Sequence, residues 1–309
     1  MTTPTQAHLD PTFRSYLASQ AQTYASYRTS YPPDLYNTVL RHHASTGGSF
    51  NLVLDVGSGP GTATQDIALW FDNAIGVDPG QEMIAAARNL GRKTKSGNDV
   101  RFEVAGAEEF SGIEGLEEGS VDLLCSAMAA HWFDMNKFWS QAAKVLKPGG
   151  TVALWTLASS FCHPSTPNAA KVQEVMFRFE RETLAPYETP GNRLSRDMYD
   201  NLILPWNTSP PIAVFPESLL VRHVYDREGV LTNGESFFGG GGKTTLEELE
   251  KGLGTASMVT RWREQHPDLV GTEKDVVKQH IQEMRQALGG KEWFVRGSGT
   301  AILLFKKST

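Results

Sequence analysis

The sequence predicts an α/β protein built on a doubly wound, mostly parallel sheet. Short apolar runs suited to buried strands alternate with segments whose apolar residues recur at helical spacing. A glycine-rich turn at residues 57–61 separates the first apolar run, residues 52–56, from the helical segment that follows. In this class of fold, ligands bind at such turns beyond the carboxyl ends of the strands, so the fold prediction also locates a candidate site.

Five strands are expected in the first half of the chain. The runs that predict them are residues 52–56, 74–78, 100–104, 121–125 and 151–157. The second run ends at Asp78, which places a carboxylate at the carboxyl end of its strand. Residues 147–150, Lys-Pro-Gly-Gly, are expected to end the helix that precedes the fifth strand.

Four helices are expected between and before these strands. The first begins at the proline pair 32–33, because proline is tolerated in a first helical turn. The second follows the glycine turn, and we expect it to bury Ile67, Trp70 and Phe71 on one face. The last two are residues 81–90 and residues 138–146. Asp134 is the expected N-cap of the fourth helix.

The second half of the chain departs from this alternation. A turn-rich segment at residues 159–167 precedes a helical stripe between Val172 and Thr183. After the glycines at 239–242, two helices are expected, the second beginning with a capping box of Thr272 and Asp275. These helices interrupt the sheet and therefore predict a cap.

The last two strands of the sheet are expected at residues 219–225 and 293–305. Gly297 and Gly299 in the final strand permit a β-bulge. We therefore expect seven strands, with a helical cap formed by insertions around strand six, at about residues 218–226, which closes over a substrate. The expected divisions are an N-terminal lid at 1–30, a core at 31–158, cap insertions at 159–292 and a final strand at 293–309.

Composition favours a cytoplasmic enzyme acting on small molecules. The 309 residues include 40% hydrophobic residues, and no apolar run approaches the roughly 20 residues of a membrane span. A net charge of −6 argues against a nucleic-acid scaffold and against a polybasic membrane patch. Two cysteines, Cys125 and Cys162, are too few for a disulfide or zinc framework, and no metal is expected.

Two acidic residues beside the glycine turn indicate which cofactor it holds. The order Gly57-x-Gly59-x-Gly61 is one residue short of the dinucleotide fingerprint, and no lysine follows to form a P-loop. Asp55 would repel a pyrophosphate but suits an ammonium group, and Asp78 suits the two hydroxyls of a ribose. S-adenosylmethionine carries both groups. Asp55, the turn with Ser58, and Asp78 therefore predict this cofactor.

Further cofactor contacts are expected at the ends of the neighbouring strands. His131 and Trp132 follow the fourth strand, where the reacting methyl should lie, and an aromatic ring there can shield a sulfonium by a cation–π contact. Ala107 and Glu108 follow the third strand and are candidates for the adenine amino group. The remaining candidates for the cofactor are Pro79, Met83 and Ala127.

Four segments resemble the fungal trans-aconitate methyltransferase family. They are residues 28–32, 57–64, 130–134 and 190–194, which match in order, with looser similarity toward the C-terminus. The resemblance implies a class I methyltransferase (Rossmann-like) fold, S-adenosylmethionine as the methyl donor, and a small acidic acceptor. It also implies that Tyr24, Arg28 and Tyr31 fold over the cofactor and that Arg193 faces the acceptor.

The sequence departs from this family at the expected acceptor wall. Residues 254–257 read Gly-Thr-Ala-Ser where the family has Arg-Thr-Trp-Ser, so an arginine and a large aromatic residue are replaced. This change removes a carboxylate clamp and enlarges the pocket. A bulkier or less charged acceptor is therefore an alternative to trans-aconitate.

The role of His131 depends on the acceptor. A carboxylate, with a pKa of about 4, is ionised near pH 7, so His131 would only orient it and arginines would carry specificity. A hydroxyl must lose its proton, and His131 is then the first candidate for the general base. The sequence leaves a carboxylate and a secondary-metabolite hydroxyl both open.

Two other functional classes compete with a small-molecule methyltransferase. A pseudo-methyltransferase would keep the cofactor as a structural or electrostatic element while the cap guides a cyclisation or elimination. A cofactor-bound regulatory module is the third hypothesis, although no charge run or low-complexity arm suggests a partner. Only the first class releases S-adenosylhomocysteine in step with product.

Overall fold

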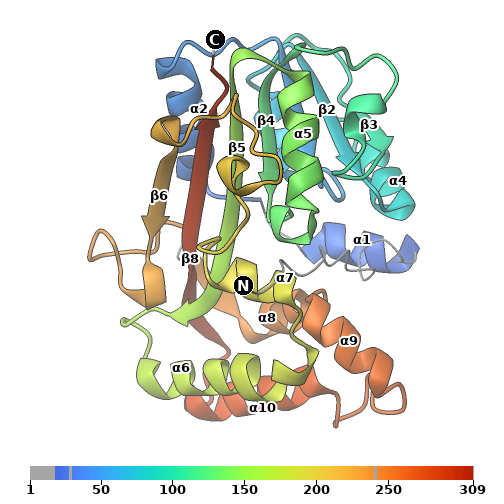
Figure 1. Cartoon of the computed structure of the whole chain (residues 1–309). Coiled ribbons are helices and arrows are strands. Elements are labelled where there is room, and N and C mark those ends of the chain that lie inside the picture. Colours follow the sequence, from blue (N-terminus) through green and yellow to red (C-terminus); the bar gives the residue numbers. More distant parts are fainter. Residues whose placement is uncertain (1–17, 28–29, 240–241, 309) are drawn as a thin grey trace.

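The computed structural model of the chain describes residues 18–27, 30–239 and 242–308 (Figure 1). Its centre is an eight-stranded sheet in the order β3-β2-β1-β4-β5-β8-β6, with β7 paired to β8 off this path. The strands are β1 (Leu52–Val56), β2 (Asn73–Asp78), β3 (Arg101–Val104), β4 (Val121–Ala127), β5 (Leu146–Cys162), β6 (Val221–Tyr225), β7 (Gly242–Thr245) and β8 (Trp293–Lys306).

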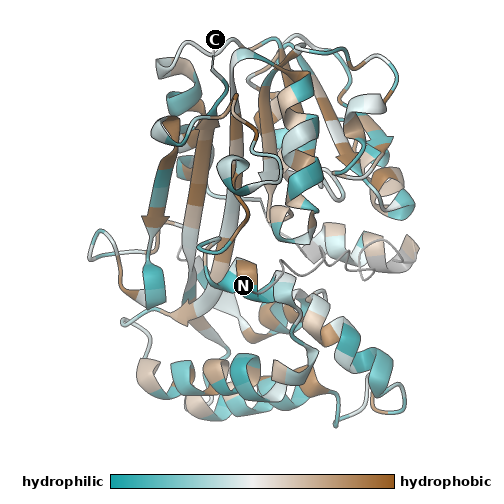
Figure 2. Cartoon of the chain, viewed as in Figure 1, coloured by the Kyte–Doolittle hydropathy of each residue, from teal (hydrophilic) through white to brown (hydrophobic). Residues whose placement is uncertain are grey.

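The predicted mixed α/β fold with a mostly parallel sheet is confirmed. Strands β3, β2, β1, β4 and β5 pair in parallel, and β8 runs antiparallel to both β5 and β6. Strands β1 and β4 are buried along almost their whole length, as expected where both faces of a parallel sheet are covered. Figure 2 shows hydrophobic residues along the sheet and mixed colouring along the helices.

Helices cover the sheet and build a separate cap. The core helices are α2 (Pro33–Ser45), α3 (Thr62–Ala68), α4 (Gln81–Asn89) and α5 (Met135–Val145). The cap helices are α6 (Ala169–Arg178), α7 (Pro190–Arg196), α8 (Leu246–Leu253), α9 (Ser257–Gln265) and α10 (Val276–Ala287). The helix α1 (Ala18–Tyr27) lies against α4 and α8. The cap has its own hydrophobic cluster, formed by α6, α8, α9, α10 and the ends of β5 and β8.

Strands β5 and β8 extend from the core into the cap (Figure 1). They pair from Thr151–Lys306 at one end to Cys162–Arg296 at the other. A register shift lies between Leu157 and Ser160, opposite Gly299, so the extra residue of the predicted bulge belongs to β5.

Three local predictions were wrong. Trp70 is 51% exposed, because α3 ends at Ala68 and only Ile67 and Phe71 of the predicted face are buried. Three helices, not two, follow the glycines, and the last is capped by Asp275 alone, which accepts from the Val277 N–H at 2.9 Å.

Three further observations on the described residues concern membrane-spanning helices, cysteines and metal sites. None of their helices is both long and apolar enough to cross a bilayer. Cys125 and Cys162 are both buried thiols. No group of three His, Cys, Asp or Glu side chains suited to a metal ion occurs within the described ranges.

Candidate active site

The glycine turn between β1 and α3 forms the floor of the site. Gly57 and Ser58 donate backbone N–H groups to the Val77 carbonyl at 2.8 and 2.9 Å, which ties the turn to β2. Gly59 and Gly61 both have left-handed backbones, with φ of 54° and 83°. A Cβ on Gly61 would lie 2.7 Å from the Phe102 ring, whereas one on Gly59 would meet open space. Gly61 is therefore required for packing, and Gly59 presents bare backbone.

Asp78 is held at the edge of this turn by backbone donors. Its Oδ2 accepts from the Gly59 N–H at 3.0 Å, and its Oδ1 accepts from the Gly80 N–H at 2.8 Å. The carboxylate is thus oriented to accept hydrogen bonds from a ligand that lies across the turn.

Asp55 lies behind the turn rather than in the cavity. Its side chain is fully buried, and the Thr64 hydroxyl donates to its Oδ2 at 2.6 Å. Burial raises the pKa of Asp55 to about 6, although Thr64 and the Cys125 thiol beside it act in the opposite direction. Asp55 therefore supports the turn from within the core, which differs from the direct ligand contact expected from the sequence.

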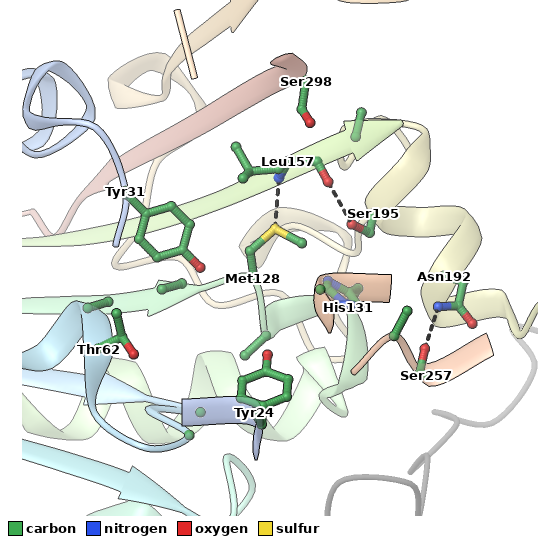
Figure 3. A pocket seen from close by; sticks show the side chains of 18 of the residues that line it. Tyr24, Tyr31, Thr62, Met128, His131, Leu157, Asn192, Ser195, Ser257 and Ser298 are labelled. Carbon is green, nitrogen blue, oxygen red and sulfur yellow. Dashed lines mark hydrogen bonds between the residues drawn. The ribbon is translucent and has the colours of Figure 1, made fainter. Parts of the chain in front are cut away.

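A cavity of about 710 Å³ opens between the turn and the cap. Its wall contains most of the sequence-predicted site residues: Tyr24, Tyr31, Gly57, Ser58, Gly59, Asp78, Pro79, Met83, Ala107, Ala127, His131 and Trp132. Figure 3 shows Tyr24, Tyr31 and His131 arranged around Met128. The volume lies in the range of small-molecule and cofactor sites.

Four predicted residues do not line this cavity. Asp55 lies beneath the turn, and Gly61, within the turn, faces the ring of Phe102. Glu108 accepts from the Asp134 N–H at 3.1 Å, at the start of α5. The Arg193 side chain is 64% exposed and forms an ion pair with Glu188 at 3.1 Å. Arg28 lies outside the described residues.

His131 is buried at the centre of the cavity wall. Its Nδ1 lies 3.0 Å from the Tyr199 hydroxyl, and its ring centroid lies 4.5 Å from that of Trp132. Burial lowers the pKa of His131 to about 3, and no charged group opposes this effect in the described part of the chain. The imidazole is therefore neutral at physiological pH.

Comparisons with known proteins agree with this geometry. Residues 54–154 match a family described as a methyltransferase domain. A Dictyostelium discoideum protein named as a methyltransferase is 27% identical over 252 residues, which cover 81% of this chain and 88% of that protein. A Saccharomyces cerevisiae protein, named as an S-adenosylmethionine-dependent methyltransferase, is 32% identical over 143 residues, covering 46% of this chain and 47% of that protein.

A solved structure from Anaeromyxobacter dehalogenans, described as a type II methyltransferase, has the same fold. Its TM-score is 0.60, with 24% identity over 91% of this chain and 97% of that one. The chain is an S-adenosylmethionine-dependent methyltransferase, and its fold is that of class I methyltransferases. The trans-aconitate branch of the family stays a prediction, and the pseudo-methyltransferase alternative is not favoured.

The cavity of this methyltransferase suits an adenosyl cofactor at its core end. The Ser58 hydroxyl is buried there and has no hydrogen-bond partner within the described residues. Gly59 leaves room that a side chain would occupy, and Asp78 offers an oriented carboxylate. An unsatisfied buried hydroxyl is expected to find its partner in a bound ligand or water.

Sequence reasoning missed the cap side of the methyltransferase cavity. The residues there include Glu180, Glu188, Asn192, Ser195, Arg196, Ser257, Arg296 and Ser298. Two of them had a signal, because Asn192 stands in the segment 190–194 and Ser257 ends the altered segment 254–257. Among the others, Ser195 and Arg196 lie on α7, Arg296 and Ser298 lie in β8, and Glu180 lies in the π-helical turn after α6. The sequence did not predict which of these side chains face the cavity.

Proposed function

We propose that this methyltransferase transfers the methyl group of S-adenosylmethionine to a carboxylate of a compact small-molecule acceptor, which gives a methyl ester. The observation that carries the proposal is the buried, neutral His131. Its ring contacts are aromatic, with Trp132 and with Tyr199, and its recorded hydrogen bond is to the Tyr199 hydroxyl. A histidine in such surroundings lacks the carboxylate that usually supports a general base.

Proton transfer energetics favour an acceptor that is already ionised. Moving a proton from a phenol, with a pKa of about 10, to an imidazole with a pKa of about 3 spans about 7 units, or roughly 10 kcal/mol. A carboxylate needs no such transfer near pH 7. Neutral His131 can instead orient the acceptor by a hydrogen bond, and the cavity supplies alignment, which contributes roughly 7–11 kcal/mol in well-ordered reactions.

The core end of the cavity would hold the cofactor. Asp78 would accept hydrogen bonds from the ribose hydroxyls, and the backbone at Gly57 and Gly59 would lie against the amino-acid end. The cofactor supplies an activated methyl on a sulfonium. Trp132, on the cavity wall, would shield that positive charge by a cation–π contact.

Charges on the cap side favour a single carboxylate over a tricarboxylate. Arg196 lines the cavity but is already paired with Glu188, whose carboxylate also binds Arg193. Glu180 and Arg296 also line the wall, so cationic and anionic groups are balanced there. A ligand with three negative charges would meet two carboxylates, which supports an acceptor less charged than trans-aconitate.

The test uses methyl-labelled cofactor with a panel of carboxylic acids and their matching alcohols. We expect label in a product from which mild alkali releases methanol, because methyl esters hydrolyse and methyl ethers do not. The value of kcat/KM for the acceptor should stay constant between pH 6 and 8. Asp78→Ala serves as control and should weaken S-adenosylhomocysteine binding roughly 10- to 100-fold. Label that survives alkali would contradict the proposal.

A further inference from the structure

We propose that Asn192 and Ser257 form a neutral pair of hydrogen-bond donors that binds the acceptor's carboxylate, and that Arg261 fixes their orientation. The inference rests on the proposed function, because it assigns the group that recognises its substrate. Asn192 belongs to α7 and Ser257 to α9, and both line the cavity on its cap side.

The Asn192 amide can present only its donor side to the cavity. Its Oδ1 accepts from the Thr189 N–H at 3.1 Å, from the Thr189 hydroxyl at 3.0 Å and from the Arg261 guanidinium. A backbone N–H and a guanidinium are donors only, so the amide cannot flip without losing both bonds. One Nδ2 hydrogen is bonded to the Ser257 hydroxyl at 2.9 Å, which leaves the second hydrogen for a ligand.

The same reasoning makes Ser257 a donor. Its hydroxyl oxygen accepts from Asn192 Nδ2 and, at 3.4 Å, from Arg261. Its own hydroxyl hydrogen has no acceptor among the described residues, although its side chain is 6% exposed. A hydroxyl that receives two donors turns its hydrogen outward, and the remaining direction is the cavity.

The donor pair lies beside the reacting end of the cavity. Gly191 precedes Asn192 and packs directly on the expected methyl-transfer site, since a Cβ on Gly191 would lie 2.6 Å from the Trp132 ring and 2.8 Å from the His131 carbonyl oxygen. Figure 3 shows Asn192 and Ser257 together on one side of His131, joined by their hydrogen bond. An acceptor between them and the cofactor would face both donors.

A neutral donor pair suits a carboxylate in this setting. Hydrogen bonds to an ionised acceptor are stronger than neutral ones. Arg261 also bonds the Tyr187 carbonyl at 2.8 Å and is not among the cavity-lining residues. Its charge therefore acts through Asn192 rather than by contact with the acceptor, which makes Arg261 a positioning residue.

The first experiment compares Asn192→Asp and Ser257→Ala, using whichever carboxylic acid of the panel the wild-type enzyme esterifies fastest. Asn192→Asp keeps the Oδ1 bonds to Thr189 and Arg261 but replaces the donor by a carboxylate. We expect its KM for the acid to rise at least 100-fold, and that of Ser257→Ala roughly 10- to 100-fold. S-adenosylhomocysteine affinity, measured by calorimetry, should stay within about threefold. Asn233→Asp, in an exposed loop, is the matched control.

The second experiment is a double-mutant cycle that tests how Arg261 acts. Arg261→Leu should raise KM for the acid about 10-fold in the wild-type background but add little to Asn192→Ala, since the effects of residues in one network are not additive. Arg261→Lys, which can still donate to Asn192 Oδ1, should recover part of the loss. Additive effects, or equal losses in both arginine variants, would overturn its positioning role.

The outcomes separate this inference from the proposed function. If the wild-type enzyme forms no alkali-labile product, the proposed function fails and the donor pair fails with it. If it forms the ester but Asn192→Asp leaves KM unchanged, the donor pair alone is wrong. A rise in KM with unaltered cofactor affinity supports both.

Discussion

At the scale of single residues, the glycines of one turn perform different tasks. Gly59 faces open space beside the cavity, and Gly61 packs under the ring of Phe102. The pattern Gly-x-Gly-x-Gly predicted the turn but could not distinguish these tasks, because the difference lies in a phenylalanine about forty residues away.

We expect Gly61→Ala to reduce the free energy of unfolding more than the matched substitution Gly59→Ala. Both variants place a methyl group on a left-handed backbone, which costs about 1–2 kcal/mol. Gly61→Ala adds a contact of 2.7 Å with Phe102, so its total loss in free energy of unfolding should reach about 2–4 kcal/mol. Denaturant titration measures this difference. Equal losses in the two variants would contradict the packing role of Gly61.

Residue identity also explains which of the predicted residues line the cavity. Asp78, His131 and Trp132 follow strands, and the parallel sheet brings strand ends to one edge, so their place in the cavity was predictable. The prediction that Arg193 faces the acceptor rested only on the resemblance of residues 190–194. The helix turns Arg193 outward to Glu188, and Arg196 faces the cavity instead, which depends on the rotation of a seven-residue helix.

At the scale of elements, α7 connects the cap to the transfer site. Thr189 caps the helix, and Pro190 begins it. The helix approaches the segment after β4 through Gly191, whose missing side chain leaves space for Trp132. The position of α7 therefore sets the distance between the cap residues and the reacting methyl.

Gly191→Ala should move α7 away from His131. The added Cβ would meet both a ring and a backbone oxygen at under 3 Å, and the backbone oxygen cannot rotate aside. We expect the KM for the acceptor to rise several-fold, with S-adenosylhomocysteine affinity nearly unchanged, because the turn is untouched. Parallel enzyme kinetics and calorimetry measure the two effects. A larger loss of cofactor affinity than of acceptor affinity would show that α7 does not act as described.

Element boundaries were harder to predict than the elements themselves. The run at 52–56 matches β1, and residues 81–90 match α4 within one residue. β5 is longer than predicted at both ends. At its start, Leu146 pairs with Val121 of β4, and Gly149 and Gly150 bond to Lys307; at its end, β8 continues the pairing to Cys162 in the cap. Such pairing is a tertiary effect, which local sequence does not record.

At the scale of the whole molecule, buried histidines make stability depend on pH. Burial lowers the pKa of His280 to about 4 and of His131 to about 3, against 6.5 for the free side chain. Both are neutral when folded and bind a proton more readily when unfolded, so stability falls as the pH drops below about 6.5. Asp55, with a raised pKa, has the opposite effect between about pH 4 and 6.

His280→Leu should make this pH dependence shallower. His280 stacks on Phe179 with ring centroids 4.0 Å apart, and its buried Nδ1 has no partner in the described part of the chain. Removing it should abolish a loss of about 3 kcal/mol between pH 6.5 and pH 4. Urea unfolding at several pH values measures this. Curves that run parallel for wild type and variant would exclude His280 as a source.

The paired strands β5 and β8 run through both the core and the cap, and so join the two sides of the cavity. Because these two strands stay paired from the cofactor end into the cap, with a single register shift between Leu157 and Ser160, the cap is not a separate body attached by a linker. We expect related chains to acquire new acceptor preferences by substitution of side chains on α7 and α9, while the cofactor side of the cavity stays the same. The architecture thus lets chemistry be inherited while selectivity diversifies.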